Sequence, residues 1–226
     1  MTYLSVEEAI KKGKGIVKLR GWVHRERGSN QFKFIVLRDN TNILQCVFKK
    51  EKYNNKEWED IDKLLVESSV ELEGKIHEDK RAPTGYEVQV EKFKVIQRSE
   101  DFPLQKDQSV EFLADNRHLW LRSRKMTSML KIRSTVFRAI HDYFRNLGYY
   151  EYHSPIFQAV QCEGGSTLFD VAYFKQKGVF LAQTWQLYAE PAIFALEKIY
   201  TISPAFRAEK SKTSRHLTEL WMAEME

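Results

Sequence analysis

The stretch IVKLRGWVHRERGSNQFKFIVLRD, residues 16–39, predicts two neighbouring β-strands, because apolar and β-branched residues alternate with polar ones on both sides of a polar turn at residues 28–30. Three more runs of this kind follow at residues 43–50, 70–79 and 86–97. Turn residues lie between them, such as Pro83 and Gly85. Five short strands within about 85 residues predict a small β-barrel.

A helix is predicted between the third and the fourth of these strands. The insert at residues 52–68 is rich in lysine and acidic residues, and its Trp58, Ile61 and Leu64 have helical spacing. Five strands with a helix in this position are the wiring of an OB-fold, and OB-folds bind oligonucleotides on their open face. A small barrel that makes protein contacts is the alternative.

The composition indicates a globular protein, and the net charge permits a polyanionic partner without requiring one. The 226 residues are 42% hydrophobic and 30% charged, which excludes a disordered chain and allows one large or two medium domains. The net charge is +5, and residues 9–50 carry eleven lysines and arginines against only Glu26 and Asp39. This basic stripe, residues 9–50, could bind the phosphate backbone of a nucleic acid. The alternative is that its charged side chains form an ordinary solvated surface.

The cysteine pattern and the hydropathy argue against a disulfide-stabilised, secreted or membrane-spanning protein. Cys46 and Cys162 lie far apart, so neither a CxxC metal pair nor a disulfide framework is predicted, and a reducing compartment fits. The first fifteen residues contain no apolar stretch of signal-peptide length, and no run approaches the ~20 apolar residues that span a bilayer. We expect a cytoplasmic protein without a membrane partner.

The second half of the chain predicts an α+β domain. Residues 98–125 form a polar connector in which the strand pattern stops, so we expect a barrel domain at 1–97 and a second domain at 126–226. Residues 126–147 have the apolar spacing of a long amphipathic helix, with Gly148 as its left-handed cap. Strands of a mixed or antiparallel sheet are predicted at 149–157, 178–183, 198–209 and 216–226.

Three stretches resemble the class II aminoacyl-tRNA synthetases in the order of that family. FRAEKSKTSRHLTEL, residues 206–220, resembles the second signature motif, in which two antiparallel strands and a loop hold ATP. The helix that ends at Gly148 and the strand that carries Pro155 resemble the first motif, which implies a homodimer interface. GWVHRERGSNQFKFIVLRD, residues 21–39, resembles the anticodon-binding OB domain of the subgroup that charges tRNA with aspartate, asparagine or lysine.

The resemblance implies an ATP site in the second motif. Arg207 matches the arginine that bridges the α-phosphate and the amino-acid carboxylate, for which a planar two-pronged donor is suited. Glu209, on the same face of the predicted strand, matches the glutamate that accepts from the adenine amino group, although a surface ion pair is the alternative. The remaining implied ATP residues are Arg215 and His216 at the γ-phosphate, Leu217, and Leu220 where the family usually stacks a phenylalanine on adenine.

The resemblance also implies an amino-acid site that favours asparagine. The segment EGGSTLF, residues 163–169, is similar to the mobile loop over the amino acid and supplies Glu163, at the substrate ammonium, and Ser166. Gln186 matches a polar contact to the substrate, and relatives that charge aspartate have a lysine in place of Ala189. Burying an aspartate carboxylate without a cationic partner is costly, whereas a neutral amide needs only hydrogen bonds.

On the barrel, the resemblance implies that an anticodon with a central uridine is bound. Phe34 matches the aromatic residue on which that uridine stacks, a contact worth ~1–3 kcal/mol. Gln45 and Glu87 match neighbours that read base edges, and Arg27 matches a phosphate or base contact. Single-stranded RNA recognition needs both stacking and hydrogen bonds to base edges.

The implied function is a ligase that activates asparagine with ATP and transfers it to the 3′ end of tRNA. The glycine-rich third motif of the family is absent from residues 1–226, so the resemblance covers an N-terminal portion. We expect Mg²⁺ to accompany ATP with ligands beyond that portion, and we assign no metal ligand here. The alternatives are an aspartate–tRNA ligase, a non-catalytic tRNA-binding module, and an amidating paralogue, which typically dispenses with the anticodon barrel.

Overall fold

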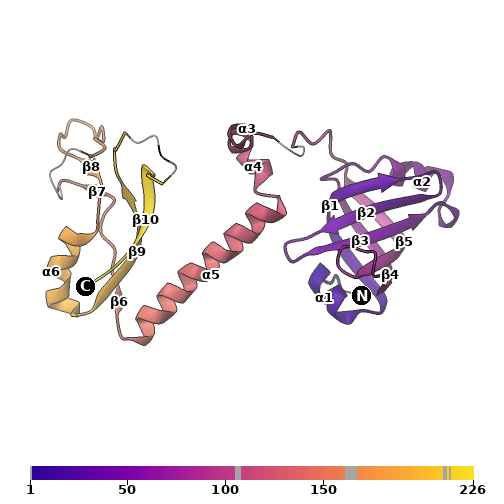
Figure 1. Cartoon of the computed structure of the whole chain (residues 1–226), viewed down its shortest axis with the longest axis horizontal. Helices are drawn as coiled ribbons and strands as arrows, with labels where there is room; N and C mark the ends of the chain where they lie inside the picture. Colours follow the sequence, from indigo (N-terminus) through magenta and orange to yellow (C-terminus); the bar gives the residue numbers. More distant parts are fainter. Residues whose placement is uncertain (1, 105–107, 161–166, 211–212, 214) are drawn as a thin grey trace. The chain divides into compact units, whose positions relative to one another are not determined.

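The chain folds into two compact units. The computed structural model describes residues 2–104, 108–160, 167–210, 213 and 215–226. One unit comprises Met1–Asn116 and the other Arg117–Glu226, and the division falls within the predicted connector at 98–125 (Figure 1).

The first unit is built around a closed five-stranded barrel, which confirms the prediction. Its strands are β1 (Gly15–Gly28), β2 (Phe32–Arg38), β3 (Ile43–Lys49), β4 (Ser69–Glu78) and β5 (Tyr86–Gln97), in the order β1-β2-β3-β5-β4. The contact between β3 and β5 is parallel and the others are antiparallel. Alternate residues point inwards and form a buried core that includes Val17, Leu19, Ile35, Leu37, Leu44, Cys46, Leu72 and Val88.

Two helices pack against the barrel core, and each begins at a capping box that the sequence supplies. Helix α1 (Val6–Lys12) begins at a capping box and ends at a left-handed Gly13, with φ of 67°. The predicted insert helix is α2 (Asn55–Asp62), which follows the short 3-10 helix η1 (Lys50–Lys52) and buries Trp58 and Ile61. Helix α3 (Val110–Asp115) lies within the segment expected to be a connector.

Asp39 joins α1 to the turn between β2 and β3. Its carboxylate accepts hydrogen bonds from the Val6 backbone N–H (2.7 Å), the Thr41 N–H (2.7 Å) and hydroxyl (2.6 Å), and the Asn42 N–H (3.0 Å). Partial burial acts to raise the pKa of Asp39, but these hydrogen bonds outweigh it, so the pKa lies below its ordinary value. The ionised carboxylate therefore stabilises the folded unit.

We expect the substitution Asp39→Asn to destabilise the first unit by about 1–3 kcal/mol near neutral pH, because an amide cannot accept all four bonds. A group whose pKa is depressed on folding stabilises above its unfolded pKa, about 3.9 for Asp, and this contribution is lost as the pH falls through the folded value. The difference in urea-unfolding midpoint between wild type and variant should therefore shrink from about pH 7 to about pH 3. Asp101→Asn, at an exposed position, is the matched control; equal midpoints at neutral pH would contradict the assignment.

The described residues of the second unit form a mixed three-stranded sheet, a separate pair of short strands and three helices. Its elements are α4 (Arg117–Trp120), α5 (Arg124–Asn146), β6 (Tyr150–Glu151), β7 (Phe157–Gln158), β8 (Phe180–Leu181), α6 (Gln186–Leu196), β9 (Ile199–Phe206) and β10 (Glu219–Met225). The sheet order is β10-β9-β6, with β10 antiparallel and β6 parallel to β9, while β7 and β8 form a separate pair. The long helix α5 and the left-handed Gly148, with φ of 81°, are as predicted.

Helices α5 and α6 cover opposite faces of this sheet (Figure 1). Consecutive residues of a strand point to opposite faces. Ile199 belongs to a buried cluster with Trp185 and with Ala189 of α6, whereas the next residue, Tyr200, stacks on Phe144 of α5 with 4.9 Å between the ring centroids. The first two residues of β9 thus pack against both helices. No helix in the part of the chain that the structure describes is long and apolar enough to cross a membrane.

Three local predictions for the second unit were wrong. The strand expected at 198–209 ends at Phe206, because Ala208 donates its N–H to Thr167 (2.7 Å) instead of continuing the ladder with β10. The strand expected at 149–157 is divided into β6 and β7 by the segment that contains Pro155, which has no N–H to donate. Residues 186–196, for which no helix was predicted, form α6.

Candidate functional site

Phe34 and Arg27 form a stacking platform on the outer face of the barrel, in which Arg27 is exposed. They are cross-strand partners on β2 and β1, and the Arg27 guanidinium carbon lies 4.7 Å from the centroid of the Phe34 ring. Phe32, two residues earlier on the same face, is stacked against Phe34 with 6.2 Å between centroids. Phe34 is half-buried and is not sealed within the barrel. The Arg27 guanidinium thus lies over the Phe34 ring, and unpaired bases stack both on aromatic rings and on guanidinium planes.

Gln45 and Glu87 lie side by side on the same outer face. Gln45 on β3 donates from Nε2 to Oε2 of Glu87 on β5 at 2.9 Å, and both residues are about nine-tenths buried, with 8% exposure each. His77 on β4 contacts the other carboxylate oxygen, with 3.1 Å between Nε2 and Oε1. The structure therefore brings together two predicted residues and adds His77, which the sequence analysis did not identify.

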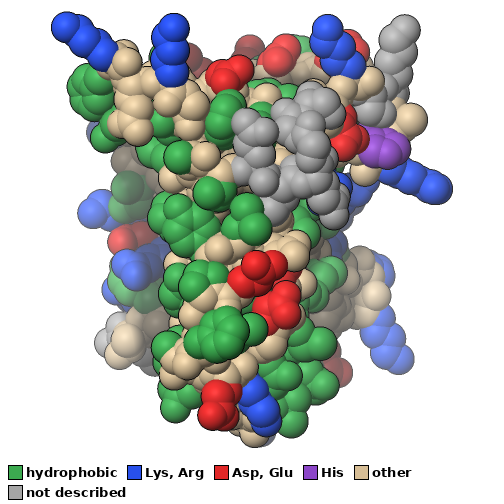
Figure 2. Space-filling view, turned by 90° about the vertical axis from the view of Figure 1, so that its left-hand side faces the viewer, with side chains coloured by type: hydrophobic (Ala, Val, Ile, Leu, Met, Phe, Trp, Pro, Cys, Tyr) green, Lys and Arg blue, Asp and Glu red, His purple; other side chains and the backbone are tan. Residues whose placement is uncertain are grey.

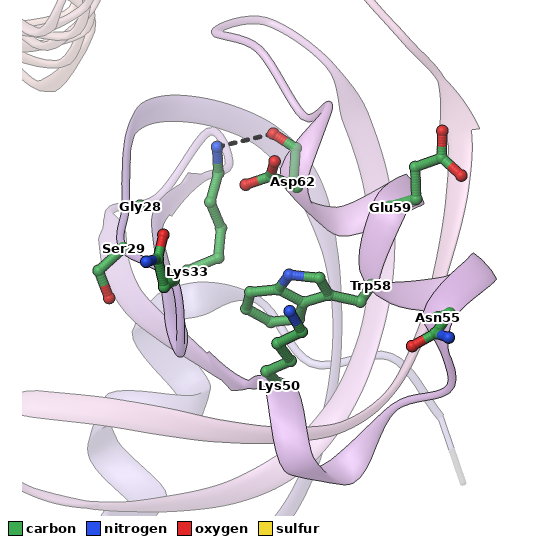
Figure 3. Close-up of a pocket in the computed structure, with 9 residues that line it drawn as sticks. Gly28, Ser29, Lys33, Lys50, Asn55, Trp58, Glu59 and Asp62 are labelled. Carbon is green, nitrogen blue, oxygen red and sulfur yellow. Dashed lines mark hydrogen bonds between the residues drawn. The ribbon is translucent and has the colours of Figure 1, made fainter.

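Part of the predicted basic stripe is neutralised within the barrel. A cavity lies between the β1–β2 turn and α2, and Figure 3 shows Lys33, Lys50, Trp58 and Asp62 around it. The Lys33 ammonium donates to the Asp62 carbonyl at 3.0 Å and lies 2.6 Å from a carboxylate oxygen of Glu26. Because Lys33 is only 4% exposed, its charge is balanced inside the protein and is not available to a phosphate.

Arg207 and Glu209 lie at the start of the loop that connects β9 to β10. The hairpin is held at this point by the Arg207 N–H, which donates to the Thr218 carbonyl at 3.0 Å. Both side chains are exposed, and no side-chain hydrogen bond or ion pair in the described part of the chain engages either of them. The guanidinium and the carboxylate are thus free to meet a ligand, although they do not share a strand face as predicted.

The other residues predicted to bind ATP follow in the same hairpin. Arg215, His216 and Leu217 are exposed near the end of the loop, and His216 Nδ1 contacts the Thr213 hydroxyl. Leu220 lies on β10 opposite Ala205 and is half-buried. The predicted antiparallel pair of strands joined by a loop is confirmed.

The segments that carry the predicted amino-acid site lie next to this hairpin. Gln183 donates from Nε2 to the Thr167 hydroxyl at 2.7 Å, and Phe206 donates its N–H to the Ala182 carbonyl at 2.8 Å. Together with the bond from Ala208 to Thr167, these contacts join three separate stretches of sequence into one region. Glu163 and Ser166, which precede Thr167, lie outside the described residues.

Gln186 and Ala189 occupy different environments at the start of α6. Gln186 is exposed and donates to Glu190 at 3.2 Å, whereas Ala189 is fully buried against Trp185. The carboxylate of Glu224 on β10 accepts from the Thr184 hydroxyl at 2.8 Å and so holds the N-terminal end of this helix. The position of Ala189 is therefore fixed by the packing of α6 on the sheet.

Exposed apolar side chains lie on α5, the helix that resembles part of the first signature motif. On α5, Met129, Leu130, Ile132 and Val136 are between 48% and 64% exposed. Pro155 is exposed in the loop after β6, and its carbonyl accepts from Gln158 at 2.8 Å. Figure 2 shows that hydrophobic side chains also gather at the side of the second unit that carries α6. A helix with a solvent-facing apolar stripe has the character of an interface.

A polar cluster lies where α5 meets β6. The Glu151 carboxylate pairs with Arg145 and with His153, at 3.0 Å from Nε2 of the latter, and Arg145 Nε donates to the Tyr200 hydroxyl at 3.1 Å. Burial acts to raise the pKa of Glu151, but the bonds from Arg145 and His153 outweigh it and hold the pKa below its ordinary value. Among the described residues, no three His, Cys, Asp or Glu side chains gather as a metal site requires.

Comparison with known proteins identifies both halves of the chain. The family of tRNA synthetases class II (D, K and N) matches residues 109–226, and the OB-fold nucleic acid binding domain matches residues 17–96. The asparagine–tRNA ligase of Thermoplasma acidophilum is 50% identical over 210 residues, which cover 93% of this chain and 49% of that protein. The asparagine–tRNA ligase of Symbiobacterium thermophilum is 39% identical over 227 residues, or 100% of this chain and 52% of that protein.

Solved structures agree with these relatives. The crystal structure of asparaginyl-tRNA synthetase from Pyrococcus horikoshii complexed with asparaginyl-adenylate superimposes with a TM-score of 0.91 and 39% identity, covering 100% of this chain and 52% of that one. The chain thus spans about half the length of the relatives it matches. It belongs to the class II tRNA synthetases (D, K and N), with an OB-fold nucleic acid binding domain in its first half.

Proposed function

We propose that the chain is the N-terminal portion of an asparagine–tRNA ligase. The observation that carries the proposal is the similarity to asparagine–tRNA ligases along 93% to 100% of the chain. In the proposed reaction, asparagine and ATP form an asparaginyl adenylate and pyrophosphate. The activated acyl group is then transferred to the 3′ end of tRNA.

The β9–β10 hairpin is proposed to bind ATP. Activation is an in-line attack of a carboxylate on the α-phosphorus, so two anions must be brought together and the charge on the phosphoryl oxygens stabilised. Arg207 can donate two parallel hydrogen bonds to this charge, and its guanidinium is exposed without a described partner. Glu209 accepts from the adenine amino group, and Arg215 and His216 hold the γ-phosphate. Mg²⁺ accompanies the nucleotide, and no residue of this chain is assigned to it.

Asparagine is proposed as the amino acid, with aspartate as the alternative. Glu163, Ser166 and Gln186 are assigned to the substrate. The small, buried Ala189 provides no cation for a side-chain carboxylate, so aspartate would enter this site without a charged partner. A neutral amide avoids that cost.

The barrel is proposed to bind the anticodon, with residues 1–97 as its domain, 98–125 as a hinge and 126–226 as a partial catalytic domain. The central uridine stacks on Phe34 beside Arg27, and Gln45 and Glu87 read base edges. The contact of Arg27 over Phe34 supports this assignment, because bases stack on aromatic rings and on guanidinium planes, and the charge of the guanidinium attracts a phosphate.

A homodimer is proposed to form through α5, Gly148 and the segment around Pro155. The exposed apolar residues on α5 support this, since a stripe of this kind is seldom left in water. Sedimentation equilibrium at micromolar concentration should give twice the monomer mass. A monomer at all concentrations tested would contradict this interface.

For residues 1–226 by themselves, a tRNA-binding module without catalysis is the second candidate. The barrel is closed and has a large core, whereas among the described residues the buried cluster of the second unit is small and consists of Trp185, Ala189 and Ile199. We therefore expect the isolated chain to bind tRNA in a salt-sensitive manner and to form no adenylate.

The test is the charging of tRNA with labelled asparagine by a protein of the relatives' full length that contains this chain. Asparagine should be attached to a tRNA whose anticodon has a central uridine, and aspartate should not. Charging with aspartate in preference to asparagine would transfer the assignment to the alternative substrate. The absence of any charging, together with intact tRNA binding, would favour the non-catalytic module.

A further inference from the structure

One row of side chains crosses all five strands on the outer face of the barrel. Cross-strand pairing places in this row Arg25 of β1, Val36 of β2, Gln45 of β3, Glu87 of β5 and His77 of β4. Phe34 lies two residues before Val36 and on the same face. Diagonal neighbours of this kind are about 7–8 Å apart, so a base stacked on Phe34 has its edge within reach of Gln45.

Glu87 fixes the orientation of the Gln45 amide. An ionised carboxylate only accepts hydrogen bonds, so the amide must present Nε2 to Glu87, at 2.9 Å. The amide oxygen then points away from Glu87, and no hydrogen bond described in the structure engages it. Gln45 therefore presents its oxygen as an acceptor to a ligand on this face, and one of its two N–H donors is taken by Glu87.

His77 holds Glu87 in the position that makes this possible. The two carboxylate oxygens are divided between Gln45 and His77, with 3.1 Å between His77 Nε2 and Oε1. A carboxylate held at both oxygens has a fixed plane, whereas one held at a single oxygen can rotate. His77 itself is at the edge of the pair, with a side chain that is 36% exposed, so it contributes little to the barrel core.

The orientation of the amide selects one pyrimidine over the other. Uracil presents an N3–H donor with a carbonyl acceptor beside it, and these match the Gln45 oxygen and its remaining N–H in this orientation. Cytosine presents an acceptor at N3 with an amino donor beside it, which is the opposite order. A reversed amide would present a donor and favour cytosine. We propose that His77 is a positioning residue for RNA reading, which fixes Gln45 through Glu87 so that the barrel accepts uridine and rejects cytidine.

This inference rests on the proposed function, in which an anticodon with a central uridine binds this face. The test measures the affinity of the 226-residue chain, at one salt concentration, for two tRNA transcripts that differ only in a uridine or a cytidine at that position. We expect His77→Leu to weaken binding of the uridine transcript about tenfold, as for one lost hydrogen bond to a charged group, and not to weaken binding of the cytidine transcript.

Two conservative variants separate positioning from a merely structural role. In His77→Gln the amide nitrogen is the same number of bonds from Cα as Nε2 of histidine, so the donor is restored and discrimination should return. In His77→Asn the amide nitrogen takes the place of Nδ1, which is too short to reach Glu87, so discrimination should remain lost. Lys75→Leu, two residues earlier on the same face of β4, is the matched control for a change of surface charge.

A double-mutant comparison links His77 to Gln45. In a Gln45→Met background, which lacks the amide, His77→Leu should have no further effect on discrimination. Additive effects of the two substitutions, equal weakening of both transcripts by His77→Leu, or equal rescue by Gln and Asn would each overturn the inference. A wild-type chain that does not distinguish the two transcripts would overturn the proposed anticodon assignment itself, which is a different result.

Discussion

Arg207→Ala should lower asparagine-dependent exchange of pyrophosphate into ATP by about 10²–10³-fold, the usual cost of removing a donor that stabilises transition-state charge. The assay uses a protein of the relatives' full length that contains this chain. Arg207 is exposed and its side chain has no described partner, so its loss should not unfold the second unit. The expected effect is therefore on catalysis and not on stability.

Two further variants make this prediction specific. Arg207→Lys retains the charge but not the two-pronged geometry, and we expect it to remain strongly impaired. Arg117→Ala removes an exposed arginine of the same unit and should exchange at the wild-type rate. Exchange by Arg207→Ala within twofold of wild type would exclude Arg207 from the ATP site.

Phe34→Ala should weaken tRNA binding by the isolated chain about 5–150-fold, which corresponds to the ~1–3 kcal/mol of one stacked base. The ring is half-buried on the outer face, next to Arg27, and does not belong to the barrel core. The dependence of the affinity on salt should be unchanged, because phenylalanine neutralises no phosphate. Binding to transcripts by filter retention or fluorescence anisotropy at several salt concentrations measures both quantities.

Phe34→Trp is the matched control, since it retains a stacking surface and should bind nearly as well as wild type. Phe34→Leu retains apolar volume without an aromatic face and should resemble the alanine variant. If all three variants bind as tightly as wild type, RNA does not stack at this position, and the anticodon assignment is wrong.

The barrel could be predicted from the sequence because most of its strands pair antiparallel with the next strand in the chain and have alternating side chains. Residues 16–39 already contain the pattern of β1 and β2, and Gln45 and Glu87 could be placed on strands by the same alternation. The hydrogen bond between them could not be predicted, because it depends on the parallel contact of β3 with β5, strands that are separated by α2 and β4. His77 faces Glu87 across the antiparallel contact of the consecutive strands β4 and β5, so the spacing of these two residues around the turn could have located it.

The second unit was less predictable because tertiary contacts decide its local structure. Residues 186–196 are mostly apolar, show no amphipathic period and contain Pro191, so no helical pattern distinguishes them from a buried strand. The end of β9 at Phe206 depends on a bond from Ala208 to Thr167, which lies some forty residues earlier in the sequence. The motif around Arg207 could still be identified, since a family resemblance does not require the strand ends to be known.

The comparison of asparagine with aspartate in the exchange reaction tests the central claim most directly. With ATP and labelled pyrophosphate, a full-length protein that contains this chain should exchange label rapidly when asparagine is present and at background rates with aspartate alone. Exchange that is supported by aspartate and not by asparagine would contradict the claim.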